Sequence, residues 1–430
     1  MNCASYVDPI IGTVGDERAS FCHGGGKTYP GAVVPGGMVQ VSPDTITGGD
    51  NGTGYNYANN TIEGFSFNHM SGIGWFGDLG NLQIMPTVGD TDLRSGSNQW
   101  TSFKKGTVGW KSAFSHEHES ARAGYYSVLL ERYGILAEAT ATTHTGLLRF
   151  SYPADTDARV LFNFSRRIGG YADFQKVTIA SDTRIEGEIR CTPAGGGFGR
   201  GQGEIAYTLY FVCEFSSPFQ NARFFSDETM MEQPLTSFEH EDVGLSVCVN
   251  SNKPLVLRCG VSYVDLDGAR RNLETECPDF DFDRISETAF IHWDEALSAI
   301  TVEGSDETDK TIFYTCLYHT LLDPRTATDV DGRFAIGNKG ILTAEHTQRT
   351  MFSGWDVYRS EFPLLTLIRP DVVNDTVCSL TTIADFNNSA YLPRWELAGN
   401  DSGCMIGNPA LLVIADACVK GIQHFDVDHA

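Results

Sequence analysis

The chain has 430 residues, of which 41% are hydrophobic and 11% aromatic, so it can bury large cores and its length favours two domains over one. Lys and Arg number 31 and Asp and Glu number 55, which gives a formal net charge of −24 and argues against a nucleic-acid partner, whose phosphates would be repelled. No apolar run approaches the roughly 20 residues that a transmembrane helix requires.

Residues 6–263 consist of short segments that alternate apolar and polar residues and are separated by Gly, Pro, Asn and Asp. Such segments at turn-punctuated spacing predict an antiparallel β-sandwich or supersandwich. The predicted strands include residues 37–42, 82–86, 125–131, 135–143, 147–152, 160–164, 205–214, 243–249 and 255–261.

The pattern changes to helical spacing near Pro278. Residues 282–300 carry apolar side chains at positions 290, 293, 296, 297 and 300, after carboxylates that suit a helix N-terminus. Further helices are predicted at about 309–322, 356–367, 369–387 and 409–420. About 125 residues of helices with apolar faces on several sides have little to pack against, so we expect an all-α domain that is incomplete in this chain.

The eleven cysteines occur singly, without a CxxC pair, and we interpret them as isolated thiols rather than a disulfide scaffold. The eleven histidines show no HxxxH or HEXXH spacing, which argues against a zinc site. The chain has no GxSxG motif, so serine hydrolase chemistry has no support.

A glycine-rich segment at 65–86 has four glycines between 72 and 80 that allow the backbone to bend tightly. We expect it to present His69, Trp75 and Asp78 from a surface loop. An exposed tryptophan there suits stacking on the apolar face of a sugar ring. A buried core tryptophan is the alternative.

A second segment, at 352–359, places a Trp355–Asp356 pair at a helix start, with Arg359 one turn later. The pair offers a carboxylate for hydroxyl groups and an aromatic wall. Alternatively, Asp356 caps the helix and Arg359 is its surface partner.

A third segment, at 392–407, holds Arg394, Trp395, Glu396 and Asp401 in a polar loop before the last helix. A glycosidase needs two carboxyl groups, roughly 6.5–9.5 Å apart in an inverting enzyme. The candidates in the chain are Asp356, Glu361, Glu396 and Asp401.

Several long motifs occur in one order: YVDPIIGT, YPGAVVPGGMVQVSPDT, HMSGIGWFGDLGNLQIMP, FSHEHESARAGYYSV, IFYTCLYHTLLDP, GWDVYRSEFPLLTLIRPDVVND and CMIGNPALLVIADACVKGI. Through them the chain resembles glycoside hydrolase family 92. The resemblance implies an N-terminal β-sandwich at 1–265, a helical linker at 266–304 and the start of an (α/α)6 catalytic barrel at 305–430. It also implies a calcium-dependent, exo-acting, inverting α-mannosidase with its active site between the two domains.

The resemblance implies substrate-binding roles for individual residues. Trp355 and Asp356 match a pair that holds the terminal mannose in the −1 subsite, and Trp75 matches a tryptophan on the leaving-group side of α-1,2-specific members. Arg359 and Arg394 lie in matching motifs. The general acid, the general base and most Ca²⁺ ligands are expected beyond Ala430, in motifs that are absent from this sequence.

The expected function is hydrolysis of terminal α-mannosyl residues of glycans, with α-1,2 linkages favoured. The alternatives are a non-catalytic glycan-binding module and a hydrolase of mannose-1-phosphate linkages in the same family. The family implies a periplasmic or extracellular location, although the sequence shows no signal peptide. The oligomeric state cannot be read from the sequence.

Overall fold

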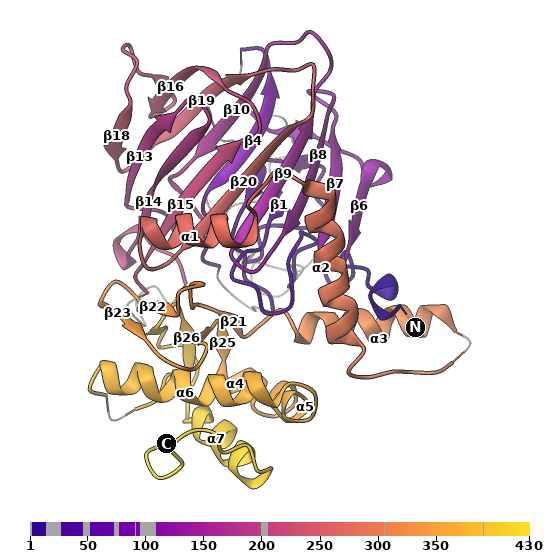
Figure 1. Cartoon of the computed structure of the whole chain (residues 1–430), viewed down its shortest axis with the longest axis vertical. Helices are drawn as coiled ribbons and strands as arrows, with labels where there is room; N and C mark the ends of the chain where they lie inside the picture. Colours follow the sequence, from indigo (N-terminus) through magenta and orange to yellow (C-terminus); the bar gives the residue numbers. More distant parts are fainter. Residues whose placement is uncertain are drawn as a thin grey trace.

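The computed structural model describes residues 2–13, 27–45, 52–72, 77–90, 92–94, 109–198, 205–304, 306–389 and 391–430. Two antiparallel sheets pack face to face in the N-terminal part, and a helical part lies at one end of them (Figure 1). A β-rich N-terminal region followed by a helical part is the arrangement that the sequence predicts.

The two sheets contain most of the described strands. The first has the order β1 (Ser42–Asp44), β3 (Gly64–Ser66), β4 (Gln83–Val88), β10 (Ala158–Asn163), β19 (Gly244–Val249), β16 (Gln220–Ser226) and β17 (Thr229–Met230). The second has the order β18 (Ser237–His240), β13 (Phe174–Ser181), β14 (Arg184–Cys191), β15 (Tyr207–Phe215), β20 (Leu255–Ser262), β9 (Thr145–Ser151), β8 (Ile135–Ala141), β7 (Tyr125–Leu130) and β6 (Glu119–Arg122).

Strand β15 shows how the sequence produces this packing. Its odd-numbered residues, such as Leu209 and Phe211, belong to the core between the sheets. Val212, on the opposite face, packs with Leu273 of helix α1 (Leu266–Glu276). Because successive side chains of a strand point to opposite faces, one strand contributes to both cores.

Helices α1, α2 (Phe282–Leu297) and α3 (Glu307–Thr320) follow the sandwich. Each begins after an aspartate, Asp265, Asp281 or Asp306, whose side chain accepts a backbone N–H of the first turn. Such N-caps satisfy donors that have no partner within the helix. Helix α1 packs closely on β20, since a Cβ at Gly260 would lie 2.5 Å from the carbonyl oxygen of Ala269.

The remaining elements are short strands and four helices. The strands are β2 (Thr61–Ile62), β5 (Ser112–Ala113), β11 (Arg166–Arg167), β12 (Gly170–Tyr171), β21 (Arg325–Thr326), β22 (Arg333–Ile336), β23 (Gly340–Thr343), β24 (Arg349–Thr350), β25 (Phe352–Ser353), β26 (Trp395–Leu397) and β27 (Asn400–Asp401). The helices are α4 (Gly354–Val357), α5 (Glu361–Ile368), α6 (Pro370–Phe386) and α7 (Pro409–Val419), and single 3-10 turns occur at η1 (Cys3–Tyr6), η2 (His116–His118) and η3 (Pro193–Gly195).

Two sequence predictions of local structure are wrong. Residues 37–42 form a loop with a strand only from Ser42, and the helix predicted at 356–367 is divided into α4 and α5. Pro363 explains the division, because its ring would clash with the carbonyl of residue 359 in a continuous helix. In the observed fold Pro363 lies in the first turn of α5, where proline is tolerated.

A loop at 31–41 joins the sandwich to the helical part. Gly36 donates its N–H to Leu321 at 2.9 Å and accepts the N–H of Thr326 at 2.9 Å. The indole N–H of Trp293, on α2, donates to the carbonyl of Val33 at 2.6 Å. The two parts are therefore connected by backbone hydrogen bonds as well as by apolar contacts.

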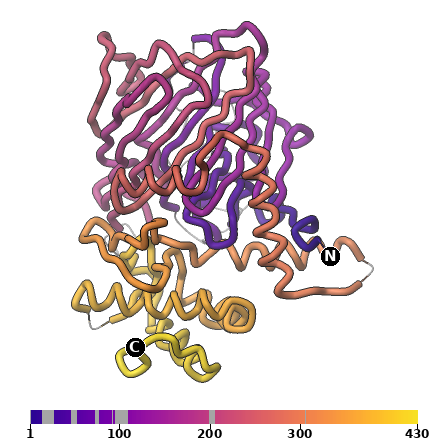
Figure 2. Tube along the Cα trace, in the orientation of Figure 1, coloured from indigo at the N-terminus to yellow at the C-terminus, as the bar shows by residue number. Residues whose placement is uncertain are grey.

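The first residues of the chain also pack on the helices, as the trace in Figure 2 shows. Ala4 donates its N–H to Asp294 of α2, and Asp8 donates to Thr315 of α3, both at 3.0 Å. Tyr6 stacks on Tyr314 with ring centroids 5.6 Å apart. Within the described residues, no helix is both long and apolar enough to cross a membrane.

Candidate functional site

The short helix α4 carries Trp355 and Asp356 at the surface of the helical part. The indole of Trp355 is 36% exposed and the side chain of Asp356 is 51% exposed. Arg359 lies 4.0 Å from the Asp356 carboxylate and is itself exposed, so their attraction is weak. Asp356 can therefore accept hydrogen bonds from a ligand beside an aromatic face.

Helix α4 is fixed to the segment that contains Arg394. Gly354 donates its N–H to the carbonyl of Arg394 at 2.9 Å. A Cβ at Gly354 would lie 3.0 Å from Pro409, a tight contact that favours glycine at this position. The structure thus brings together two segments that the sequence analysis considered separately.

The Arg394 guanidinium organises the loop before α7. It donates to the carbonyls of Met405 at 3.0 Å and Gly403 at 3.2 Å, and lies 3.7 Å from the Asp401 carboxylate. Gly407, further along this loop, is in van der Waals reach of Trp355, since a Cβ there would lie 3.9 Å from the indole. Arg394 therefore positions the loop that flanks Trp355.

A cavity of about 760 Å³ opens next to this loop, within the usual size range of small-molecule sites. Its polar lining offers both hydrogen-bond donors and acceptors. The polar residues of the lining include Lys339, Asn387, Tyr391, Arg394, Asp401 and Asn408. This composition suits a ligand with many hydroxyl groups.

Glu396, one of the candidate carboxyl groups, is fully buried and already engaged. Its oxygens accept the N–H of Gly399 at 2.6 Å, the N–H of Met351 at 2.8 Å and the hydroxyl of Thr350 at 3.1 Å. Burial raises the pKa of Glu396 to about 7, although the three hydrogen bonds act to lower it. Glu396 thus holds the turn between β26 and β27 rather than facing a substrate.

Glu361, at the start of α5, has a different environment. Burial, followed by the negative charges of Asp323 and Asp356, raises its pKa to about 8. It therefore carries a proton at neutral pH and can donate a hydrogen bond, as protonated carboxyls do in many enzyme sites. Because Asp356 and Asp323 are its charged neighbours, Glu361 lies between the Trp355–Asp356 pair and the segment where the helical part meets the sandwich.

At that junction a chain of polar contacts runs from the helical part into the sandwich. Arg325 donates to the carboxylate of Asp323 at 2.6 and 3.1 Å and to the side-chain oxygen of Gln40 at 2.5 Å. The same Gln40 oxygen accepts the backbone N–H of His69 at 3.2 Å. Burial raises the pKa of Asp323, and the Arg325 charge opposes this shift.

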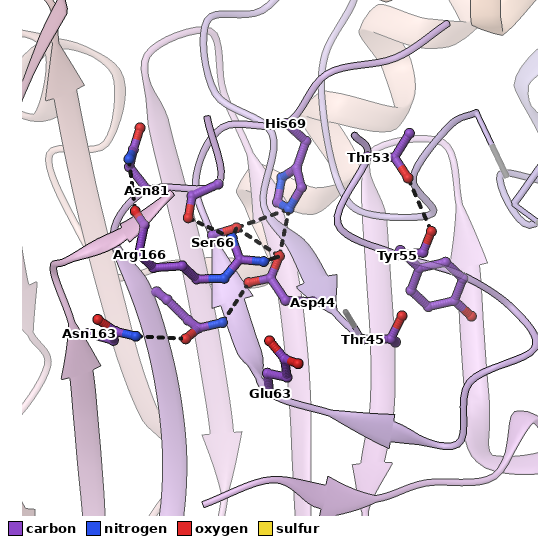
Figure 3. A network of polar contacts seen from close by, with 12 residues as sticks. Asp44, Thr45, Thr53, Tyr55, Glu63, Ser66, His69, Asn81, Asn163 and Arg166 are labelled. Carbon is purple, nitrogen blue, oxygen red and sulfur yellow. Dashed lines mark hydrogen bonds and ion pairs between the residues drawn. The ribbon is translucent and has the colours of Figure 1, made fainter. Parts of the chain in front are cut away.

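The chain continues into a fully buried cluster around Asp44 (Figure 3). The Asp44 carboxylate lies 3.1 Å from Nε2 of His69 and 3.0 Å from a guanidinium nitrogen of Arg166, and it accepts the hydroxyl of Ser66 at 3.0 Å. Ser66 and Asp44 both contact the same ring nitrogen of His69. This geometry differs from a Ser–His–Asp triad, in which serine and aspartate bond opposite nitrogens.

Asp78 forms a second buried ion pair, with Arg167. Two guanidinium nitrogens donate to its carboxylate at 2.7 and 2.8 Å, and the hydroxyl of Tyr207 and the N–H of Phe198 donate as well, at 2.9 and 3.0 Å. A Cβ at Gly197 would lie 2.4 Å from both partners. The pair therefore binds two glycine-rich segments together.

The expectation that His69 and Asp78 lie exposed on a surface loop is wrong, because both are fully buried by these partners. Trp75 lies outside the described residues. Gln40, Asp323 and Arg325 were not predicted as members of the junction, although Asp323 lies in the IFYTCLYHTLLDP motif and Arg325 directly follows it. No spacing signal relates positions 40 and 325.

Family models and solved structures identify relatives of the chain. The glycosyl hydrolase family 92 N-terminal domain matches residues 6–262, and the family 92 catalytic domain matches residues 268–430. A family GH92 α-mannosidase from Bacteroides thetaiotaomicron, BT3965, is 30% identical with a TM-score of 0.89, and the match covers 100% of this chain and 55% of that one.

Two further relatives show the same coverage. The inverting mannosidase BT2199 from the same bacterium is 27% identical with a TM-score of 0.83, over 100% of this chain and 54% of that one. An uncharacterized secreted glycosidase of Arthroderma benhamiae is 25% identical, over 97% of this chain and 50% of that protein. The chain therefore spans about half the length of the relatives that it matches.

Proposed function

Because the chain belongs to glycosyl hydrolase family 92, we propose that it serves the hydrolysis of terminal α-mannosyl residues of glycans, with α-1,2 linkages favoured. The solved relatives BT3965 and BT2199 are mannosidases. The observation that carries the proposal is that Trp355 is exposed beside Asp356. The backbone hydrogen bond from Gly354 to Arg394 fixes the helix that carries both residues. An indole face with an adjacent carboxylate suits a sugar ring and its hydroxyls.

In this proposal Trp355 packs on the apolar face of the terminal mannose, and Asp356 accepts hydrogen bonds from its hydroxyls. Arg394 positions the neighbouring loop, and Arg359 provides a cation at the rim. Trp75 is proposed on the leaving-group side. From the family we also propose that the domains are divided at residues 265 and 304 and that the last part belongs to an (α/α)6 barrel. A periplasmic or extracellular location is proposed as well, and the secreted relative supports it.

The reaction is proposed to be exo-acting and inverting. A general acid protonates the leaving oxygen while a general base activates water on the opposite face of the ring. Glu396 does not suit either role, because its oxygens are engaged by Gly399, Met351 and Thr350. Turnover of an aryl α-mannoside by this chain would show that its own residues supply the acid and base, whereas mannoside binding without turnover would assign it substrate recognition alone.

Calcium is implied by the family and remains a proposal. Among the described residues, no group of three or more His, Cys, Asp or Glu side chains is arranged to hold a metal ion. Ca²⁺ is also held by backbone carbonyls and by Asn and Gln side-chain oxygens, so no residue of the chain is assigned to the ion. Loss of mannoside affinity after chelation, with recovery on adding Ca²⁺, would support calcium; unchanged affinity would count against it.

Calorimetric titration with mannoimidazole, the ligand bound in a structure of BT3965, tests the proposal directly. Trp355→Ala and Asp356→Asn should each weaken binding at least tenfold. The matched controls are Tyr171→Ala, an exposed aromatic on β12, and Asp371→Asn, an exposed aspartate at the start of α6. Equal affinity of all four variants would show that the sugar binds elsewhere.

A further inference from the structure

Two of the cysteines face each other across neighbouring strands. Cys213 of β15 and Cys259 of β20 are directly opposite in an antiparallel pair whose register is continuous from Tyr210 to Phe215. Both side chains are fully buried in the core between the two sheets. Among the paired strands that the structure describes, this is the one position where a cysteine pairs with a cysteine.

The hydrogen bonds around this position decide how close the two residues are. Ser216 donates its N–H to Val256 of β20 at 2.9 Å, whereas Phe215 donates in the other direction, to Thr183 before β14. On β20, Val261 donates away from β15, to His144 before β9. Since N–H directions alternate along a strand, even-numbered residues of β15 and β20 bond to one another and odd-numbered residues do not.

Cys213 and Cys259 therefore form a non-hydrogen-bonded pair. In such a pair the facing Cα atoms are about 4.5 Å apart, closer than in a hydrogen-bonded pair. Disulfides span Cα separations of about 4.4–6.8 Å, so the strands already provide the required backbone distance. Burial and a hydrogen bond with the facing Cys213 thiol both raise the pKa of Cys259.

We propose that Cys213 and Cys259 form a cross-strand disulfide when the protein folds in the presence of a disulfide oxidant, either glutathione disulfide or a protein disulfide oxidoreductase. One thiolate attacks the oxidant, forms a mixed disulfide and releases a thiol; the second thiolate then displaces the other thiol. The two cysteines lose two protons and two electrons, and the oxidant's S–S bond is reduced to two thiols.

The bond forms before the sheets close over the sulfurs, because both thiols are inaccessible in the folded protein. It closes a loop between residues 213 and 259 that contains β16 to β19. Closing a loop of this length restricts the unfolded chain, so the oxidised protein should unfold at a temperature that is higher by a few degrees.

Peptide mapping of the whole 430-residue chain tests the proposal. The protein is refolded in a glutathione redox buffer, denatured, treated with iodoacetamide and digested with trypsin without reduction. Tryptic peptides 201–223 and 259–270 each contain one cysteine of the pair and should appear as one linked species that reduction separates. Full alkylation of both cysteines, or a link from either to another cysteine, would overturn the proposal.

The same digest contains internal controls. Cys191 and Cys277 are equally buried, but Cys191 faces Tyr207 across its strand and Cys277 is the C-cap residue of helix α1. Both should be alkylated, in peptides 191–200 and 272–284. A variant with Cys213→Ala and Cys259→Ala should have a melting temperature that is insensitive to dithiothreitol, unlike the oxidised wild type and the Cys191→Ala variant. An equal response of wild type and double variant would also count against the disulfide.

Discussion

Arg325 donates a hydrogen bond of 2.5 Å to the side-chain oxygen of Gln40, a residue 285 positions earlier in the chain. Through this contact the ion pair of Arg325 and Asp323 in the helical part is continuous with the buried His69–Asp44 cluster of the sandwich. The orientation of the two parts is thereby specified by directional polar contacts, which tolerate little sliding.

Replacing Arg325 should strongly destabilise the chain. Arg325→Met leaves the buried carboxylate of Asp323 without its cation and removes one of the two donors to the Gln40 side-chain oxygen. Breaking a buried pair costs about 3–5 kcal/mol. Urea unfolding followed by tryptophan fluorescence measures the loss. Arg284→Met, which removes an exposed partner of Asp279, should cost less than about 1 kcal/mol. Similar losses in both variants would contradict the role of the junction.

Glu361 should make stability depend on pH. Its folded pKa of about 8 lies above the ordinary value of 4.5, so the native state retains a proton that the unfolded chain releases. The stability that the protonated Glu361 side chain contributes is fully present below pH 4.5 and is lost as the pH rises through 8. Glu361→Gln should therefore gain stability relative to wild type as the pH rises from 5 to 8, by about 3–4 kcal/mol.

The pH test needs the difference between variant and wild type, because burial also raises the pKa values of Asp329 and Glu396, to about 6 and 7. Asp329 and Glu396 are present in both proteins, so their contributions to the pH dependence cancel when the two stabilities are subtracted. Glu287→Gln, on the exposed face of α2, is the control and should show no such gain. A wild-type-like pH profile for Glu361→Gln would mean that Glu361 is ionised in the folded chain.

Gly197 and Gly89 give a matched pair of substitutions. Both have positive φ, +83° and +74°, but a Cβ at Gly197 would collide with the Asp78–Arg167 pair, whereas nothing lies within 4 Å at Gly89. Gly89→Ala should cost about 1–2 kcal/mol of backbone strain. Gly197→Ala should cost about 1–3 kcal/mol more by overpacking, measured by chemical denaturation. Equal costs would show that the ion pair can move aside.

Arg394→Lys tests the loop beside Trp355. Lysine keeps the charge but cannot hold the carbonyls of Met405 and Gly403 with a planar fork. We expect mannoimidazole to bind about tenfold more weakly, in line with the loss of one or two hydrogen bonds. Arg369→Lys, at the exposed start of α6, should leave the affinity unchanged. Unchanged affinity for both variants would separate the loop from sugar binding.

Local patterns predicted much of the fold. The patterns in 205–214 and 282–300 predicted β15 and α2, because residues facing the same core recur at every second position in a strand and at every third or fourth position in a helix. The same patterns could not predict the buried charges. The sequence around Asp78 predicts an exposed loop, because its partner Arg167 lies 89 positions later in the chain. Glu396 was likewise predicted in a polar loop, because the turn that it holds is a tertiary feature.

Sugar binding by the candidate site residues stays a prediction. Trp355, Asp356 and Arg394 were identified from residue type and the resemblance, and the bond between Gly354 and Arg394 shows that their segments meet. Glu361 was one of four candidate carboxyl groups, and sequence gave no means of ranking them. Its raised pKa depends on Asp323 and on burial, both of which are tertiary properties.

The docking of the first turn, η1, on α2 and α3 has a consequence for the order of events during synthesis. Ala4 and Asp8 find their partners, Asp294 and Thr315, only after roughly 300 more residues have been translated. At about 5–20 residues per second, this is a wait of roughly 15–60 s. Residues 3–8 therefore dock only after α2 and α3 have been made, and during that interval Ala4 and Asp8 lack these two partners.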